Sequence, residues 1–485
     1  MKKIIENKIE FEIEDGVLIK MLRRVGSPED IHIPHVLATG DIINSIGSNF
    51  FHDSCNSIVI SDEITDIQEE AFAYSKLRSV RWSKGCEIIP KKCFYKCSIA
   101  EISGIQGVKR IGSYAFANTC LFEFVWPTGC KRIPNGCFYD GALQNIYGIS
   151  HVERIGVRAF ASSYLSEIRW PQGCEIIPNW CFSECLLKHI AGIENVRKIG
   201  SGAFEATHIE KFVWPSGCDV IPELCFAFST LTEISGIENV KKIKEFAFCH
   251  TDLPSFNWPS ACDVIPKNCF QSSAIESITN VQDVRDIEFS SFAGSRIKSF
   301  EWPSECKTIP AKCFDDSCLS EISNIADVEC IQETAFSKTK LTSFKWPSKC
   351  REIPAYCFSS SSLESISNIE NVSEIKMGAF MECHFKTFDW PASCSRIPAR
   401  CFERSDELEQ VSNLENISSI GAAAFACVTK IKQLDFSQNC VTSIGHCAFV
   451  KIDREKIKLP YYLSTDVDDL FSDKLYVLRV VLDAK

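Results

Sequence analysis

The amino-acid sequence predicts a β-rich repeat solenoid, and three regular series of residues support this prediction. A tryptophan recurs at a constant interval of 44 residues, at Trp82, Trp126, Trp170, Trp214, Trp258, Trp302, Trp346 and Trp390. A phenylalanine recurs every 22 residues from Phe72 to Phe402, and an isoleucine keeps the same interval from Ile67 to Ile397. Constant periods of this length are typical of stacked repeats in which each turn packs on its neighbours.

Two forms of a repeat of about 22 residues alternate and together make a 44-residue double repeat. Odd repeats contain Ile-Gly, Ala-Phe and Trp-Pro, as in residues 199–218, and even repeats contain Ile-Pro, Cys-Phe and Gly-Ile, as in residues 221–240. The chain has room for about 18–19 repeats. We therefore expect one repetitive body at residues 46–460 rather than a series of separate globular domains.

Residues 1–45 precede the clean repeat and are expected to form an N-terminal hairpin cap. Apolar and charged side chains alternate from Ile9 to Ile13, Asp15-Gly16 is a turn signal, and an apolar run follows at residues 17–19. The first turn of a solenoid exposes an apolar face and an open strand edge, which such a cap would cover.

Each repeat is expected to contribute a short strand to a parallel sheet, with little regular α-helix. In residues 121–126, Phe124 and Trp126 are predicted to point inward and Glu123 and Val125 outward, because side chains alternate across a strand. The prolines that follow tryptophan and isoleucine cannot donate to a ladder and should end strands or lie in turns. The Ala-Phe and Cys-Phe pairs should form tight turns on the opposite wall.

The periodic tryptophans alternate with a small residue at the equivalent position. This residue is glycine in the first half of the repeat region, as in Gly148, and asparagine in the second half, as in Asn324. We expect each tryptophan to fill the space that its small neighbour leaves, with a ligand-binding aromatic cage as the alternative. The change from glycine to asparagine indicates a change either in curvature or in local hydrogen bonding.

Beyond Phe402 the period slips, and residues 461–485 no longer repeat. The segment from Tyr476 to Leu482 is predicted to be a strand or a buried segment that closes the C-terminal end. No Ser- or Gly-rich linker precedes it, so we expect a C-terminal cap rather than an independent domain.

Most of the 27 cysteines follow the repeat and are predicted to be small core residues. Cysteines such as Cys93 and Cys137 alternate along the stack with alanines such as Ala115, and a second column, which includes Cys130, alternates with valines. Substitution by alanine and valine is what a packing role predicts, since free cysteine packs as a small apolar residue. A disulfide within a column would have to skip a turn, roughly 9–10 Å, which is too far.

The remaining cysteines lie outside these two columns, so the repeat does not predict whether they are buried. Some of them could be exposed and redox-active: Cys55, Cys97, Cys120, Cys185, Cys249, Cys318, Cys330, Cys383, Cys427, Cys440 and Cys447.

Composition and motifs argue against several function classes. The net charge of −11 and the pI near 5.5 disfavour a nucleic-acid partner, which needs a basic footprint. Charged residues at positions 6, 8, 10 and 12 interrupt any secretory apolar stretch, and no apolar run is long enough for membrane insertion. The nine histidines are scattered and no catalytic or nucleotide-binding motif occurs. We therefore expect a monomeric non-enzyme without metal or cofactor.

The repeat resembles the BspA-like, or Treponema pallidum type, leucine-rich repeat family. Ile111-Gly112, Ala115-Phe116, Leu121, Phe124 and Trp126-Pro127 carry this resemblance. It implies a curved leucine-rich repeat horseshoe that binds proteins, with relatives that act as surface antigens or adhesins on host proteins. The alternation of Trp-Pro and Cys-Phe repeats departs from the commoner uniform pattern.

The outward strand positions vary most from repeat to repeat, as expected of a binding face on a regular scaffold. Val125, Tyr147 and Arg169 hold such positions on successive turns, and tyrosine and arginine are enriched at binding hot spots. The candidate protein-binding residues are Phe122, Glu123, Val125, Tyr147, Glu167, Arg169, His189, Lys211 and Val213. The alternative interpretation is an ordinary mixed surface.

These observations lead to the hypothesis of a non-enzymatic protein-interaction scaffold that uses its concave parallel sheet, with host interaction as one setting. The alternatives are a cell-surface adhesin or antigen that binds host proteins and a thiol-based redox protein or enzyme. Unpaired cysteines and the charged N-terminus favour a cytoplasmic or host-delivered location, whereas the family resemblance implies the cell surface.

Overall fold

The computed structural model describes residues 2–6, 9–24, 31–51, 56–463 and 468–472. By its internal contacts the chain divides into two units, residues 1–240 and residues 241–485, which we call the N-terminal and C-terminal units. Each unit is a β-solenoid with turns spaced about 22 residues apart and little helix, which confirms the predicted fold class. The predicted boundaries at residues 45 and 460 stay predictions.

An antiparallel hairpin opens the N-terminal unit, as the sequence predicts. Strand β2 (Ile9–Glu14) pairs with β3 (Val17–Arg24) across Asp15 and Gly16, whose φ angles of 47° and 77° fit a two-residue hairpin turn. Strand β1 (Lys2–Glu6) adds to β2, an element that the sequence did not predict. On its other edge β3 pairs in parallel with β5 (Ser45–Ile46), a two-residue strand of the solenoid.

Each turn of the solenoid carries two short strands on two walls. The tryptophan ladder consists of the strands that end just before the tryptophan or its equivalent, except for the first two, which include that position. In the N-terminal unit these are β4 (Ile31–Ile33), β6 (Ser57–Ile60), β8 (Ser79–Arg81), β10 (Glu101–Ser103), β12 (Glu123–Val125), β14 (Asn145–Tyr147), β16 (Glu167–Arg169), β18 (His189–Ala191), β20 (Lys211–Val213) and β22 (Glu233–Ser235). Two 3₁₀ helices, η1 (Ile105–Gly107) and η2 (Ile149–His151), follow β10 and β14.

The isoleucine ladder consists of two-residue strands that end on the periodic isoleucine. In the N-terminal unit these are β5, β7 (Asp66–Ile67), β9 (Ile88–Ile89), β11 (Arg110–Ile111), β13 (Arg132–Ile133), β15 (Arg154–Ile155), β17 (Ile176–Ile177), β19 (Lys198–Ile199) and β21 (Val220–Ile221).

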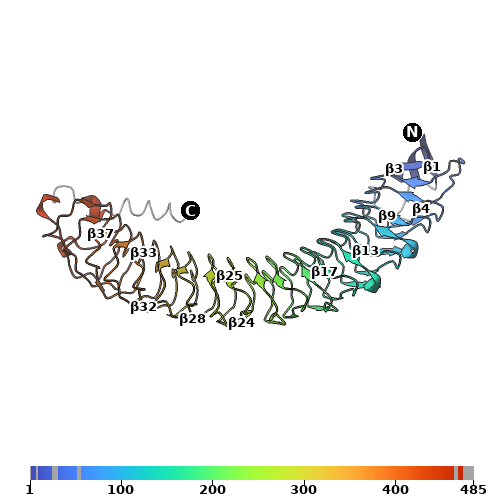
Figure 1. Ribbon diagram of the computed structural model, residues 1–485. Coiled ribbons are helices and arrows are strands. Elements are labelled where there is room, and N and C mark those ends of the chain that lie inside the picture. Colours follow the sequence, from blue (N-terminus) through green and yellow to red (C-terminus); the bar gives the residue numbers. More distant parts are fainter. Residues whose placement is uncertain (1, 7–8, 25–30, 52–55, 464–467, 473–485) are drawn as a thin grey trace. The chain divides into compact units, whose positions relative to one another are not determined.

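The C-terminal unit repeats both ladders. Its tryptophan ladder contains β24 (Ser255–Asn257), β26 (Ser277–Thr279), β28 (Ser299–Glu301), β30 (Glu321–Ser323), β32 (Ser343–Lys345), β34 (Ser365–Ser367), β36 (Thr387–Asp389), β38 (Gln410–Ser412), β40 (Leu434–Asp435) and β42 (Ile457–Lys458). Its isoleucine ladder contains β23 (Lys242–Ile243), β25 (Val264–Ile265), β27 (Asp286–Ile287), β29 (Thr308–Ile309), β31 (Cys330–Ile331), β33 (Glu352–Ile353), β35 (Glu374–Ile375), β37 (Arg396–Ile397), β39 (Ser419–Ile420) and β41 (Ser443–Ile444). Figure 1 labels β24, β28 and β32 along one edge of this unit and β25 and β33 along the other.

The isoleucine ladder is interrupted wherever proline follows the isoleucine. Gly156 donates its N–H to the Ile133 carbonyl oxygen at 2.8 Å, so β13 and β15 pair in parallel. Pro134 has no N–H to offer Ile111 in the same way, and β11 and β13 belong to separate two-stranded sheets. Near the C-terminus both Gly421 and Gly445 donate, and β37, β39 and β41 form one three-stranded sheet. The expectation that proline ends strands is confirmed.

The tryptophan-ladder strands pair in parallel, as predicted, but over most of the stack the pairing is divided into separate two-stranded sheets. Strand β12 pairs with β14, and β16 with β18, but β14 and β16 lie in different sheets. In each even repeat, which is the form with Ile-Pro, the residue after the strand has a left-handed backbone, as Gly148 does with φ 74°. This conformation turns the chain away from the ladder. Where Ile60 replaces that residue without a positive φ, β4, β6, β8 and β10 form one sheet.

The glycine that alternates with tryptophan has a backbone role, which corrects the predicted packing role. A Cβ at Gly148 would lie 3.2 Å from the Trp126 carbonyl oxygen, and at Gly104 it would lie 2.6 Å from that of Trp82. The Trp126 indole instead points into the core, where its Nε1 donates to the Cys130 carbonyl oxygen at 2.8 Å. The eight periodic indoles are at most 2% exposed, so they form no open aromatic cage.

Asparagine replaces glycine in the C-terminal unit because it tolerates the same left-handed backbone. Asn280, Asn324 and Asn368 have φ angles of 62°, 60° and 64°. Their Nδ2 groups donate to the carbonyl oxygens of the preceding tryptophans at 2.6–2.7 Å. Of the two effects predicted from this change, local hydrogen bonding is therefore present.

A third wall consists of the tight turns around the periodic phenylalanine, as predicted. Phe116 donates its N–H to the Cys137 carbonyl oxygen at 3.0 Å, and Phe138 donates to Ala159 at 2.9 Å. The phenylalanine rings stack in a buried column, with centroids of Phe116 and Phe138 5.7 Å apart. Such offset contacts add to the burial of large rings and make this column the core of each unit.

The two periodic cysteine columns are buried, which confirms their predicted packing role. Cys93 and Cys137 are 0% exposed, and Cys130 is 1% exposed with its Sγ 3.3 Å from the Val108 carbonyl oxygen. Burial raises the pKa of the Cys130 thiol to about 11. No disulfide joins the cysteines that the structure describes.

Three cysteines expected to lie outside the columns belong to a third column. Cys97, Cys185 and Cys383 stand three residues after a phenylalanine, where most other repeats have serine or threonine. At that position Ser163 Oγ donates to the Phe160 carbonyl oxygen at 2.7 Å. The exposed cysteines are Cys120, Cys318, Cys330 and Cys440, and Cys55 lies outside the described residues.

At the C-terminal end, α1 (Asp468–Phe471) lies against the last tight turn, preceded by η3 (Arg454–Lys456) and η4 (Tyr461–Leu463). Cys447 and Phe449 donate their N–H groups to the carbonyl oxygens of Asp469 and Leu470, both at 3.0 Å. These contacts support a capping role. The predicted segment from Tyr476 to Leu482 lies outside the described residues.

Candidate protein-binding face

The nine candidate residues all lie on the outward side of the tryptophan ladder in the N-terminal unit. Phe122 directly precedes β12, and the others belong to β12, β14, β16, β18 and β20. All nine side chains are exposed, and the apolar ones strongly so: Val213 is 69% exposed, Val125 66%, Tyr147 49% and Phe122 48%. Inward residues of the same strands, such as Phe124 and Phe212, are buried, which confirms the predicted alternation.

The structure brings Val125, Tyr147 and Arg169 close together. Val125 and Tyr147 are direct partners in the β12–β14 pairing, so their side chains stand side by side. Tyr147 and Arg169 line a groove of about 430 Å³ together with Ser150, Pro171 and Gln172. The groove lies where β14 and β16 are unpaired, and it is therefore a consequence of the left-handed Gly148.

The other candidate residues are more separate. Glu123 accepts a long hydrogen bond from Asn145 Nδ2 at 3.4 Å, and Glu167 is the ladder partner of His189. Lys211 Nζ lies 2.8 Å from Glu233 Oε2, and this hydrogen bond raises the pKa of the lysine. Val213 stands beside Ser235. The central candidates are thus Phe122, Val125, Tyr147 and Arg169, which we call the aromatic patch.

Sequence reasoning missed the groove and the residues on its floor. Ser150 lies in η2 after β14, and Pro171 and Gln172 follow β16; of the three only Pro171 is a marked repeat position, as part of a Trp-Pro pair, and that pair does not indicate a groove. The sequence feature that could have indicated the groove is the glycine of even repeats. Glycine readily adopts a left-handed conformation, and here that conformation ends the strand pairing and leaves a groove.

An equivalent groove of about 590 Å³ exists in the C-terminal unit. Its lining includes Ser323 and Lys345, which correspond to Tyr147 and Arg169 four double repeats later. The groove is therefore a property of the repeat, whereas the aromatic side chain is a property of the N-terminal unit.

The isoleucine ladder carries two further grooves. One of about 1030 Å³ in the N-terminal unit is lined by Asp66, Ile88 and Arg110, and one of about 780 Å³ in the C-terminal unit is lined by Glu374, Arg396 and Met377. None of the nine candidate residues predicted from the sequence lies on this wall.

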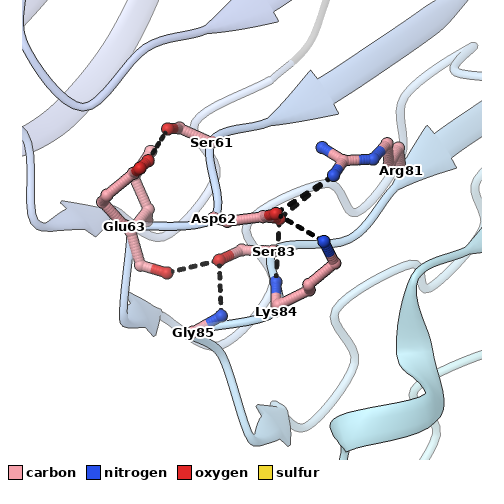
Figure 2. Close-up of polar contacts among 8 residues, drawn as sticks. Ser61, Asp62, Glu63, Arg81, Ser83, Lys84 and Gly85 are labelled. Carbon is pink, nitrogen blue, oxygen red and sulfur yellow. Dashed lines mark hydrogen bonds and ion pairs between the residues drawn. The ribbon is translucent and has the colours of Figure 1, made fainter.

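Figure 2 shows a polar cluster around Asp62 in the first turns. Its carboxylate lies 3.1 Å from Arg81 Nη2 and 3.0 Å from Lys84 Nζ, and it accepts the Lys84 N–H at 3.2 Å. Hydrogen bonds from Lys84 lower the pKa of Asp62. Because these charges satisfy one another, the cluster connects neighbouring turns and offers no unused group for catalysis.

Within the described residues, no three His, Cys, Asp or Glu side chains gather as they would around a metal ion. The same residues contain no helix with the length and apolar character needed to cross a lipid bilayer.

Comparison with known protein families gives a clear assignment for the repeat. The model of the BspA type leucine-rich repeat region, which comprises six copies, matches residues 44–166, 153–276, 243–364, 285–409 and 351–478. The chain belongs to the BspA-type leucine-rich repeat family. Proteins of this family are generally non-enzymatic scaffolds, and leucine-rich repeats typically bind protein partners.

Solved structures with similarity to this chain are also leucine-rich repeat proteins. A Bacteroides ovatus protein is 17% identical over 91% of this chain and 99% of its own, with a TM-score of 0.33. A cell surface protein from Faecalibacterium prausnitzii is 15% identical over 94% and 96%, with a TM-score of 0.29. YopM from Yersinia enterocolitica is 11% identical over 88% and 91%, with a TM-score of 0.44. Among curated proteins none matches this sequence.

Proposed function

We propose that this BspA-type protein is a protein-binding scaffold that engages its partner through the aromatic patch of the N-terminal unit. The observation that supports this proposal is that Val125 and Tyr147 are exposed side by side, next to the groove that Tyr147 and Arg169 line. Exposed apolar and aromatic side chains next to a groove are typical of interaction sites rather than of an inert surface.

The patch defines the chemistry of the partner. Phe122, Val125 and Tyr147 offer an apolar surface whose removal from water favours association. Arg169 makes no ion pair with another residue in the described ranges, so its guanidinium is available to a carboxylate of the partner. A partner that suits this face carries an apolar or aromatic side chain beside an acidic one.

The rigid turns beneath the patch favour binding without reorganisation. Phe124 and Ile168 anchor the strands from below and are 2% and 6% exposed. A preorganised surface loses less conformational entropy on association than a mobile one. Variation of outward residues on an invariant core is also how a repeat scaffold changes its specificity.

A capture experiment with matched variants tests the proposal. Full-length wild type, the Tyr147→Ala, Arg169→Glu double variant and a Lys345→Glu control are immobilised and exposed to lysates of the native cell and of a host. Lys345→Glu makes the same charge change as Arg169→Glu at the equivalent groove. We expect a protein retained by wild type and by the control to be lost from the double variant.

Equal capture by all three proteins would reject the aromatic patch as the binding site. Capture from the host lysate alone would support a host-interaction role, and capture from the native cell alone would place the partner there. Circular dichroism must show that the variants keep the wild-type fold.

A further inference from the structure

On the isoleucine ladder of the N-terminal unit, three successive turns carry an arginine on the outward side. Arg110, Arg132 and Arg154 are the outward residues of β11, β13 and β15 on successive turns. Arg132 and Arg154 are direct partners in the parallel pairing, and all three side chains are exposed. Paired strands lie about 4.8 Å apart, so the like charges of Arg132 and Arg154 are held near one another, and Arg110 follows on the adjacent strand β11, which does not pair with β13.

Three carboxylates beside these arginines pair with other cations, whereas Asp66, which lines the groove at the N-terminal end of the run, accepts a hydrogen bond from Ser45 Oγ. Glu87 lies 2.6 Å from Lys109 Nζ, and Glu153 lies 2.7 Å from Lys131 Nζ. Glu175 lies 3.7 Å from Arg197. Across the ranges that the structure describes, none of the three arginines in the run makes an ion pair or a side-chain hydrogen bond. Like charges opposite one another on a ladder destabilise it, so packing alone gives no reason for the run.

Exposed isoleucines extend the same column at both ends of the run. Ile88 precedes it and is 42% exposed, and Ile176 follows it and is 53% exposed. Both side chains are outward residues of two-residue strands, on β9 and β17. The column therefore presents a basic centre with apolar ends, and we call it the arginine strip.

Short or compact residues border the strip on one side. Within the turns of the strip, the residue after the periodic isoleucine is Gly or Pro, as in Gly112, Pro134 and Gly156, so this position carries no long side chain. At the N-terminal end of the strip, Ile88, Pro90, Arg110 and Gly112 line the groove of about 1030 Å³. An extended segment of another chain can therefore lie against the floor while its side chains reach the arginines.

We propose that the arginine strip is a second interaction surface, which binds an acidic polypeptide segment with apolar residues on either side of its carboxylates. Arginine forms paired hydrogen bonds with a carboxylate in a planar geometry, which suits recognition of Asp and Glu. A long nucleic acid fits less well, because the whole chain carries a net charge of −11 and would repel a polyanion beyond the strip. The surface lies on a different ladder from the aromatic patch, so it does not rest on the proposed function.

Binding of a short synthetic peptide with central glutamates between leucines tests the strip. Fluorescence anisotropy is measured with full-length wild type, Arg132→Gln and the control Arg396→Gln. Arg396 is exposed at the same outward position in the C-terminal unit, where its ladder partner is Ser419 instead of arginine. We expect saturable binding that Arg132→Gln weakens about tenfold, that Arg396→Gln leaves unchanged and that added salt weakens.

Two further measurements separate recognition from general charge or structural effects. A peptide with glutamine in place of glutamate should not bind, and Arg132→Gln should not lower the thermal unfolding temperature, because it removes repulsion within the strip. No saturable binding of the acidic peptide, or equal binding by wild type and Arg132→Gln, would overturn the proposal. So would a single-stranded oligonucleotide that binds through Arg132 more tightly than the peptide does.

Discussion

At the scale of single residues, the left-handed residue that follows alternate strands of the tryptophan ladder determines where grooves form. Gly148 in the N-terminal unit and Asn324 in the C-terminal unit hold the same left-handed conformation, with φ angles of 74° and 60°. Glycine reaches this region without a steric penalty, and asparagine adds a hydrogen bond to the preceding tryptophan. The groove beside Tyr147 follows from this conformation.

Substitutions at Asn324 separate the backbone effect from the hydrogen bond. We expect Asn324→Ala to lower the free energy of unfolding by about 2 kcal/mol, because it loses the 2.7 Å bond to Trp302 and places alanine at a positive φ. Asn324→Gly loses the bond but gains conformational freedom, and its loss should be smaller. Chemical denaturation of the three proteins checks this order, and a larger loss for glycine would contradict it.

The buried thiols predict a decline of stability at alkaline pH. Burial raises the pKa of Cys130 to about 11 and that of Cys174 to about 12, above the value of about 8.5 for a thiol in an unfolded chain. Below that lower value both states hold the proton. As the pH rises toward the folded-state pKa only the unfolded state ionises, so the free energy of unfolding falls.

Urea unfolding at about pH 7.5 and about pH 10 measures this effect. Cys130→Val, which places the residue of neighbouring turns at this position, should show a smaller decline between the two pH values than wild type. An equal decline would mean that other groups, such as lysines, cause the whole effect.

At the scale of structural elements, the alternation of Ile-Gly and Ile-Pro sets the pairing of the isoleucine ladder. Gly156 donates its N–H to the previous turn, and the absence of a side chain lets the turns approach. A Cβ at Gly156 would lie 2.4 Å from the Asn135 nitrogen, whereas a Cβ at Gly107 would have its nearest neighbour at 3.9 Å.

Alanine at these two glycines should therefore have different effects. We expect Gly156→Ala to lower the free energy of unfolding by about 1–3 kcal/mol through overpacking. Gly107→Ala, which has neither a close contact nor a positive φ, should leave it nearly unchanged. Thermal unfolding of both variants checks the difference, and equal stability would show that neighbouring turns relax freely.

The sequence predicts elements well where a periodic residue has a direct steric consequence. Inward Phe124, the turns around Phe116 and the termination of strands at Pro134 all follow from the chemistry of those residues. The breaks in the tryptophan ladder were not predicted, because glycine adopts either sign of φ and its presence alone does not show that Gly148 is left-handed. Strand β1 was missed because its sequence, Lys-Lys-Ile-Ile-Glu, shows no alternation of apolar and polar residues.

At the scale of the whole molecule, repetition fixes the scaffold but leaves the surface free to vary. The same groove contains Tyr147 and Arg169 in the N-terminal unit and Ser323 and Lys345 in the C-terminal unit. Exposure of eight of the nine candidate residues could be predicted from strand alternation, whereas Phe122 lies before β12 and has the parity of inward Phe124. The groove and the unpaired arginines could not be predicted, because they depend on which neighbouring turns pair and on which carboxylates are already occupied.

Hydrogen–deuterium exchange of the full chain with its captured partner tests the central claim most directly. The proposed function predicts slower exchange on binding in the peptides that contain Phe122 to Val125, Tyr147 to Ser150 and Arg169 to Gln172, with no change at the equivalent groove of the C-terminal unit. Protection confined to other surfaces, with these peptides unchanged, would contradict the assignment of the aromatic patch as the binding face.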